Sequence, residues 1–199
     1  MAKVSGIDEK LHMPTYDAFT VRAGNTFRGS MTEARMIRFF VDIQEKTKLE
    51  TNLQAAGVLP SDNQFEAHAL RVVMSGPPQP PPGAPADYAS QILSELIYNS
   101  VTTLLVGEKI MVEAPTYLFP SGAGVSPGNG TITNHGEPDP MATFKFATSV
   151  NIAPRQYFRV EMLFPRGVPG DGVPGLLANA LPPLRLWTIL DGYLTRAVQ

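Results

Sequence analysis

Residues 158–164 read Phe158-Arg159-Val160-Glu161-Met162-Leu163-Phe164, so an apolar side chain occupies every second position. Alternate side chains of an extended strand point to opposite faces, which separates the residues at 158, 160, 162 and 164 from Arg159 and Glu161. A strand with one apolar face must bury that face against a second layer of structure. Residues 155–164 therefore predict a strong strand in a β-sandwich or barrel.

The same alternation recurs along the chain. Residues 35–44 predict a strand whose apolar face comprises Ile37, Phe39, Val41 and Ile43. Further strands are expected over residues 18–22, 64–74, 101–113 and 144–150. In residues 64–74 the expected apolar face comprises Phe65, Ala67, Ala69 and Val73, and in residues 101–113 it comprises Leu104, Val106, Ile110 and Val112.

Two other segments have distinct patterns. Residues 87–99 predict the one helix, since Asp87 can cap it and apolar residues follow at helical spacing. Residues 184–198 contain Asp191-Gly192 between two apolar runs, which is typical of a type I′ hairpin. One long strand with a β-bulge accounts equally well for this segment, and both interpretations stay open.

Long connections rich in glycine and proline separate these elements, at residues 75–86, 120–140 and 165–183. Proline cannot donate to a sheet ladder, so these segments are expected outside the sheets. Residues 1–30 are polar and predict an N-terminal arm, followed by a single domain over residues 31–199. Short strands joined by long connections predict an all-β sandwich.

Composition excludes several classes of function. The net charge of −2 argues against nucleic-acid binding, and the absence of cysteine excludes disulfides and thiol chemistry. Residues 1–10 do not read as a signal peptide, and no apolar run is long enough to span a membrane, so we expect a soluble protein made in a cytoplasm. The charged fraction of 17% is low. Either a surface that is partly covered by neighbouring molecules or the many glycines and prolines would explain this low fraction.

Motifs for catalysis or metal binding are weak. Gly124-Val125-Ser126-Pro127-Gly128 matches the nucleophile elbow of hydrolases, but Pro127 lacks the N–H that the oxyanion hole requires. Metal ligands usually come in closely spaced pairs, whereas the three histidines, His12, His68 and His135, are far apart. Glu161 and Asp171 are no better a carboxylate pair than other acids. We therefore expect no enzyme activity, no cofactor, no metal and no small-molecule substrate.

Arginines without lysine distinguish the C-terminal quarter, where residues 151–199 hold five arginines. Arginine suits bidentate pairing at interfaces. Arg155, Tyr157 and Arg159 are therefore the candidate inter-subunit contacts, since Tyr157 lies on the mixed face of its strand. Trp187, Tyr157 and Tyr193 are also candidates for a sugar-stacking platform. The three long connections contain no aromatic residue, which weighs against that carbohydrate-binding alternative.

The chain resembles the single jelly-roll major capsid proteins of icosahedral, often membrane-containing, bacteriophages. Four pieces carry the resemblance, in this order: Thr51-Asn52-Leu53 with Ala56-Gly57-Val58-Leu59-Pro60, Phe65 and Arg71-Val72-Val73; Leu104-Leu105-Val106-Gly107-Glu108-Lys109 with Val112-Glu113-Ala114-Pro115 and the glycine-rich residues 120–124; Ile152-Ala153-Pro154 with Phe158-Arg159-Val160; and Leu190-Asp191-Gly192 with Arg196 and Gln199. Together they cover most of the chain from residue 35 onward.

This resemblance implies a jelly roll of about eight antiparallel strands in two sheets, with subunits that form capsomers and no catalysis. It implies a structural protein of the virion whose partners are its own copies, other capsid proteins and an internal viral membrane where one is present. Three alternatives remain open at this point: a minor capsid or cement protein, a carbohydrate-binding jelly-roll module, and an enzyme of cupin type.

Overall fold

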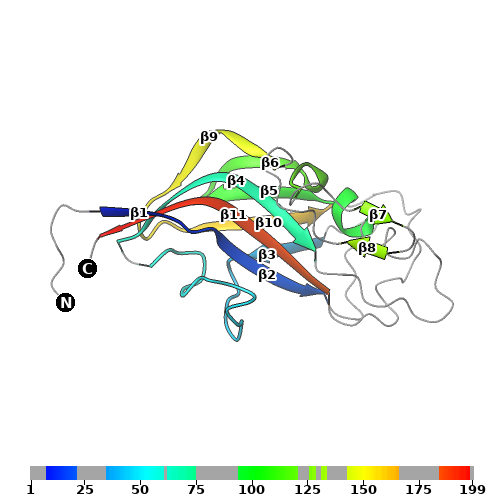
Figure 1. The fold of residues 1–199 in the computed structure, drawn as a ribbon, viewed down its shortest axis with the longest axis horizontal. Coiled ribbons are helices and arrows are strands. Elements are labelled where there is room, and N and C mark those ends of the chain that lie inside the picture. The colour runs from blue at the N-terminus through cyan, green and yellow to red at the C-terminus, as the bar shows by residue number, and fades with distance from the viewer. Residues whose placement is uncertain are drawn as a thin grey trace.

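A computed structural model describes residues 8–21, 35–60, 62–74, 94–120, 126–128, 131–133, 143–165 and 184–197. This part of the chain is nearly all β and forms two antiparallel sheets that lie one over the other (Figure 1). The five-stranded sheet contains β1 (Asp8–His12), β2 (Thr15–Val21), β4 (Gln64–Met74), β9 (Lys145–Ile152) and β11 (Leu184–Ala197). The four-stranded sheet contains β3 (Arg35–Phe39), β5 (Val101–Val106), β6 (Lys109–Pro115) and β10 (Phe158–Phe164).

The strand order is that of a jelly roll. The five-stranded sheet runs β1-β11-β4-β9, with β2 placed end to end with β1 along β11, and the four-stranded sheet runs β3-β10-β5-β6. β1 and β2, the first strands, are therefore neighbours of β11, the last strand, in one sheet. β3 and β10, the next strands inward along the chain, are neighbours in the other sheet. The fold predicted from the sequence is confirmed.

The core forms where the two sheets face each other. All four apolar residues of β10 that the alternation picked out are buried, and they belong to one cluster with Phe39, Phe65, Leu104, Leu186 and Leu190 from the other strands. Their polar neighbours Arg159 and Glu161 point to the outer side of the four-stranded sheet. Period-two alternation therefore predicted the orientation of this strand correctly.

The strand expected over residues 35–44 ends early, at Phe39. Phe40 has a positive φ of 68°, which breaks the extended path, and its ring is buried in the core beside Phe158. The Phe40 N–H donates to the Asp17 carboxylate at 2.7 Å instead of joining a strand ladder. The prediction was wrong for residues 40–44 because a contact from a distant strand overrides the local alternation.

Residues 101–113 do not form one strand, which is a second correction. They form the hairpin of β5 and β6, which turns at Gly107 with a φ of +58°. The pairing shifts register between Leu104 and Leu105, because Val112 pairs with Leu104 while Ile110 pairs with Leu105. Ile110, expected in the core, is 60% exposed.

A bulge in β4 overturns the expected apolar face of residues 64–74. β11 pairs Gly192 with Ala67 and Asp191 with Ala69, so His68 is left as an extra residue. Phe65 and Ala67 face the core before the bulge, and Leu70, Val72 and Met74 face it afterwards. Ala69 and Val73 therefore lie on the opposite face from Phe65. The prediction of a single strand here is correct, but the prediction of one apolar face along its whole length was wrong.

Residues 184–197 form one continuous strand, β11, rather than a hairpin. The register shift at Asp191/Gly192 belongs to the bulge at His68, so the single-strand interpretation is correct, but the extra residue lies in the partner strand β4 and not in β11. Gly192 is required there, because a Cβ would lie 2.0 Å from the Glu66 carbonyl oxygen of β4. The close approach of two backbones, rather than a turn, explains this glycine.

The N-terminal segment and one connection contain strands that the sequence did not predict. β2 extends the predicted strand over residues 18–22, and β1 is a strand that the sequence did not predict; both lie within the expected arm. The helix expected over residues 87–99 is described only over its final turn, η1 (Ser94–Tyr98), where Leu96 is buried; a short 3₁₀ turn, η2 (Thr116–Leu118), follows β6. Residues 75–86 and 166–183 lie outside the described residues, and the third connection contains the short pair β7 (Ser126–Gly128) and β8 (Thr131–Thr133) at one end of the sandwich (Figure 1).

We predict that Gly192→Ala lowers the free energy of unfolding by about 2 to 3 kcal/mol, since β4 and β11 must move apart to admit the methyl group. Gly107→Ala is the control, because no atom lies within 4 Å of its Cβ position. Only the positive φ opposes that change, so its expected effect is about 1 kcal/mol. Urea denaturation of both variants measures the difference, and equal losses would contradict the close contact at Gly192.

Candidate subunit-contact surfaces

Tyr157 lies where three connections meet. Its carbonyl oxygen accepts a hydrogen bond from the Gly107 N–H at 2.7 Å, and its backbone bridges to Val58. Its ring packs against Gly57, where a Cβ would lie 2.2 Å from the Tyr157 Cε2 atom. The adjacent Phe158 N–H donates to the Gly57 carbonyl oxygen at 2.8 Å. Tyr157 therefore joins the connection over residues 40–63, the β5–β6 turn and the start of β10.

Arg159 is also engaged within its own chain. Its Nε donates to Glu161 Oε1 at 2.8 Å, and its guanidinium lies 5.8 Å from the centre of the Tyr157 ring. The hydrogen bond that Arg159 donates to Glu161 and the attraction of that carboxylate raise the pKa of Arg159 above its ordinary value, against the opposing effect of burial. Only 17% of the Arg159 side chain is exposed, so its contacts lie mainly within its own chain.

Arg155 lies apart from the other two predicted contact residues. It is exposed in the turn before β10, with a φ of 61°, outside the strand where alternation placed it. The structure thus brings Tyr157 and Arg159 together in an internal junction and leaves Arg155 on the surface. A role of any of the three in contacts between subunits stays a prediction.

The outer face of the four-stranded sheet carries an apolar row that the sequence did not single out. The register aligns Met36 with Leu163, Leu163 with Val101, and Val101 with Pro115. This apolar row crosses all four strands on the side away from the core. Met36 and Pro115 are exposed and the two central residues are half-buried.

Exposed aromatic residues lie just beyond the ends of β5 and β6, in the short turns that precede Val101 and follow Pro115. Tyr98 of η1 stacks on Tyr117 of η2, with ring centres 5.7 Å apart, and both side chains are exposed together with Leu118. Exposed apolar patches often mark sites of contact with other proteins. The row and the aromatic pair are therefore the strongest candidate contact surface among the described residues. The sequence indication of this surface was the outward face of β10, where the apolar Leu163 follows the charged Arg159 and Glu161.

A row of charged and polar residues runs beside the apolar row. Arg38 pairs in register with Glu161, Glu161 with Thr103, and Thr103 with Glu113. Arg38 Nε lies 3.6 Å from Glu161 Oε1, and the Thr103 hydroxyl donates to Glu113 Oε2 at 3.2 Å. This charged row therefore has a cation at the β3 edge of the sheet and an anion at the β6 edge.

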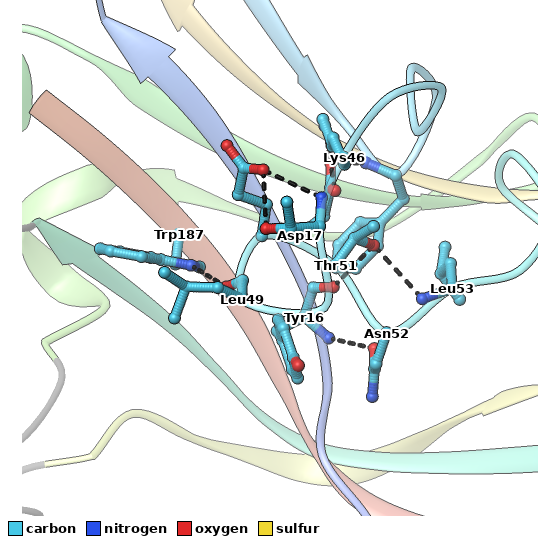
Figure 2. A network of polar contacts seen from close by, with 11 residues as sticks. Tyr16, Asp17, Lys46, Leu49, Thr51, Asn52, Leu53 and Trp187 are labelled. Atoms are coloured by element: carbon cyan, nitrogen blue, oxygen red, sulfur yellow. Dashed lines mark hydrogen bonds and ion pairs between the residues drawn. The ribbon is translucent and has the colours of Figure 1, made fainter. Parts of the chain in front are cut away.

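Residues 46–53 run beside β2 and close that edge of the five-stranded sheet (Figure 2). The Tyr16 N–H donates to Asn52 Oδ1 at 3.0 Å, and the Thr51 hydroxyl donates to the Tyr16 carbonyl oxygen at 3.1 Å. Trp187 of β11 donates its Nε1–H to the Leu49 carbonyl oxygen, at a distance of 3.0 Å. These contacts cover the outer edge of β2, which would otherwise offer unpaired backbone groups to another strand.

Asp17 anchors this segment from inside the sandwich. Its side chain is fully buried, and Lys46 Nζ lies 2.9 Å from Oδ2, the same oxygen that accepts from the Phe40 N–H (Figure 2). Burial raises the pKa of the Asp17 carboxyl above its ordinary value, while the hydrogen bonds from Lys46 and Phe40 oppose that shift. Glu50, at the surface of the same segment, has a lowered pKa because the Thr47 N–H donates to its carboxylate.

A cluster of titratable residues lies on the outer face of the five-stranded sheet, around Tyr193. His12 and His68 pack against the Tyr193 ring, at 5.6 and 5.5 Å between ring centres. His12 Nε2 lies 3.5 Å from Asp191 and His68 Nε2 lies 3.3 Å from Glu66, so each histidine has its own carboxylate. The hydrogen bond from Lys10 lowers the pKa of Glu66. No group of three or more potential metal ligands occurs among the described residues.

The remaining predicted sites have mixed outcomes. Ser126, Pro127 and Gly128 lie in β7, so the described part of the elbow motif is a strand rather than a strand-to-helix turn. His135 and Asp171 lie outside the described residues. Trp187 and Tyr193 share a face of β11 but stand six residues apart, roughly 20 Å along the strand, while Tyr157 belongs to the internal junction. These three aromatics do not form one platform.

We predict that Asp17→Asn changes how stability depends on pH. The folded protein holds the Asp17 proton more tightly than the unfolded chain, so this carboxyl contributes stability that is present below its unfolded pKa and lost as the pH rises through its folded pKa. The free energy of unfolding of the wild type, minus that of the variant, should therefore fall from about pH 4 to neutral pH. Urea denaturation across this range measures it. A difference that rises with pH would contradict the raised pKa of Asp17.

We predict that Arg159→Ala lowers the free energy of unfolding by about 2 kcal/mol, because Glu161 loses a charge-assisted hydrogen bond and Tyr157 loses its cation. Arg155→Ala is the matched control and should stay within about 0.5 kcal/mol of the wild type, since its side chain is exposed. Thermal and urea denaturation measure both. A larger loss for Arg155 than for Arg159 would contradict the contacts described above.

None of the described helices is long and apolar enough to cross a membrane. Comparison of the chain with models of protein families, with curated proteins and with solved structures finds no match.

Proposed function

We propose that this protein is a structural subunit of an icosahedral viral capsid, made in the host cytoplasm and assembled into capsomers of the virion. The observation that carries the proposal is an exposed apolar surface on a jelly roll. Jelly-roll sandwiches build viral shells, but they also build lectins and cupins, so the fold by itself does not choose among them. An uncovered apolar row with stacked aromatics beside it favours contact with another protein surface.

The four pieces of sequence that resemble capsid proteins support the proposal through their structural roles. Gly57 of the first piece packs against Tyr157 and hydrogen-bonds to Phe158 of the third. Gly107 of the second piece donates to the Tyr157 carbonyl oxygen. Gly192 of the last piece meets the β4 backbone. The pieces thus include positions that only glycine fills without strain, as expected of a shared framework.

The partners follow from this role. Copies of the chain and other capsid proteins contact its outer faces, loops and sheet edges, and an internal viral membrane is a further partner where the virion has one. Many weak contacts repeated by symmetry stabilise a closed shell. A minor capsid or cement protein would use the same surfaces, and the copy number per particle distinguishes it from the main lattice subunit.

We predict that the purified chain forms oligomers or closed particles as its concentration rises, because the apolar row gains burial on association. Sedimentation velocity and negative-stain electron microscopy measure the size of the products. Arg155→Glu should reduce assembly without loss of thermal stability, whereas Arg155→Lys, which retains the charge but not the bidentate geometry, should reduce it less. A wild type that stays strictly monomeric at its solubility limit would contradict the proposal.

A further inference from the structure

The outer face of the four-stranded sheet has an arrangement of residues that is complementary to itself. In the charged row, Arg38 stands on β3 and Glu113 on β6, at opposite edges of the sheet. Three strand spacings separate them, roughly 14 Å. The two side chains therefore cannot pair within one chain, although each is exposed at its edge: the side chain of Arg38 is 61% exposed and Glu113 is also exposed.

A two-fold axis parallel to the strands relates the two edges. Such an axis turns a second copy over and reverses its strand order, so β3 of one copy lies over β6 of the other. Positions along the strands are kept, so each row meets the same row of the second copy. The apolar row then lies on the apolar row, with Met36 over Pro115 and Leu163 over Val101. In the charged row, Arg38 lies over Glu113, and the same contact occurs twice.

We propose that the outer face of the four-stranded sheet is a homodimer interface, in which two copies of this chain pack face to face about that two-fold axis. Sheets that pack in this way stand about 10 Å apart, a gap that the long side chains of arginine and glutamate span. Burial of the apolar row supplies the driving force, and the paired charges of Arg38 and Glu113 set the orientation of the second copy.

The free edge of β6 is a weaker place for a second copy than the face of the sheet. Met111 is the extra residue of the bulge, because Val112 pairs with Leu104 and Ile110 pairs with Leu105. A bulge twists an edge and interrupts its row of backbone donors and acceptors. Lys109 and Pro115 stand at the two ends of the strand and also discourage edge pairing. The face therefore offers the longer uninterrupted surface.

This inference names the surface that one contact of the proposed capsid subunit uses, but it depends only on the register of four strands. The two claims fail separately. Loss of the dimer with normal particle formation overturns the interface alone, whereas a dimer that forms no larger assembly supports the interface and counts against the capsid subunit.

Charge reversal tests the orientation of the two copies. Arg38→Glu and Glu113→Arg should each weaken dimerisation at least about tenfold, because each places two pairs of like charges across the interface. The double variant Arg38→Glu/Glu113→Arg should restore dimerisation toward the wild-type level. Arg38→Glu also faces Glu161 within its own chain, and the second substitution does not relieve that repulsion, so recovery reports the contact between chains. Sedimentation equilibrium gives the dissociation constants, and thermal unfolding confirms that all variants fold.

Two matched methionines test the apolar row. Met36 is 44% exposed within the row, and Met13 is 41% exposed between β1 and β2, in the other sheet. Met36→Lys should weaken dimerisation at least about tenfold, since it buries an unpaired charge, whereas Met13→Lys should leave it unchanged. Three results would overturn the interface: a wild type without a dimer, a double charge variant that does not recover, or equal effects of the two methionine substitutions.

Discussion

The closure of two apolar sheet faces on each other is the constraint to which the remaining features of this molecule respond. β10 contributes an unbroken alternation of buried and outward side chains, and β4 and β11 oppose it from the other sheet. Such faces stay in water only at a large cost in free energy, so the sandwich must be closed at its edges as well as at its centre. The bulge at His68 keeps β4 facing the core along a strand of eleven residues. Gly192 lets β11 follow it closely.

The edge beside β2 is closed by a buried charge rather than by apolar contacts. Asp17 enters the core side of β2, accepts the Phe40 N–H at the end of β3 and pairs with Lys46. One carboxylate thus links both sheets and the segment that covers the β2 edge. Burial raises the pKa of this carboxyl above its ordinary value, so the link carries a desolvation cost that Lys46 and the Phe40 N–H offset only in part.

Once the sandwich is closed, its two outer faces differ. The five-stranded sheet carries ion pairs around Tyr193, where each charged group has a partner in the same chain. The four-stranded sheet carries an apolar row with a cation at one edge and an anion at the other. A sandwich with an exposed face of this kind suits a role in which contacts between copies matter more than chemistry, and this is the physical basis for the proposed capsid subunit.

Local alternation was enough to predict the class of fold, the central strands and the buried face of β10. Alternate side chains of a strand point to opposite faces, so the order of residues within one strand determines which of them are buried. It failed at Phe40 and at His68, where a partner distant in sequence sets the conformation, and at Gly107, where a tight turn separates two strands that alternation alone predicts as one. The proposed contact surface shows the same division. Tyr157 and Arg159 stand out in the sequence, yet they serve an internal junction, whereas Met36, Val101, Pro115 and Leu163 belong to different strands and form a row only through their register. A row across a sheet depends on which strands are neighbours, and hydrogen bonding between distant segments establishes that order only when the chain folds.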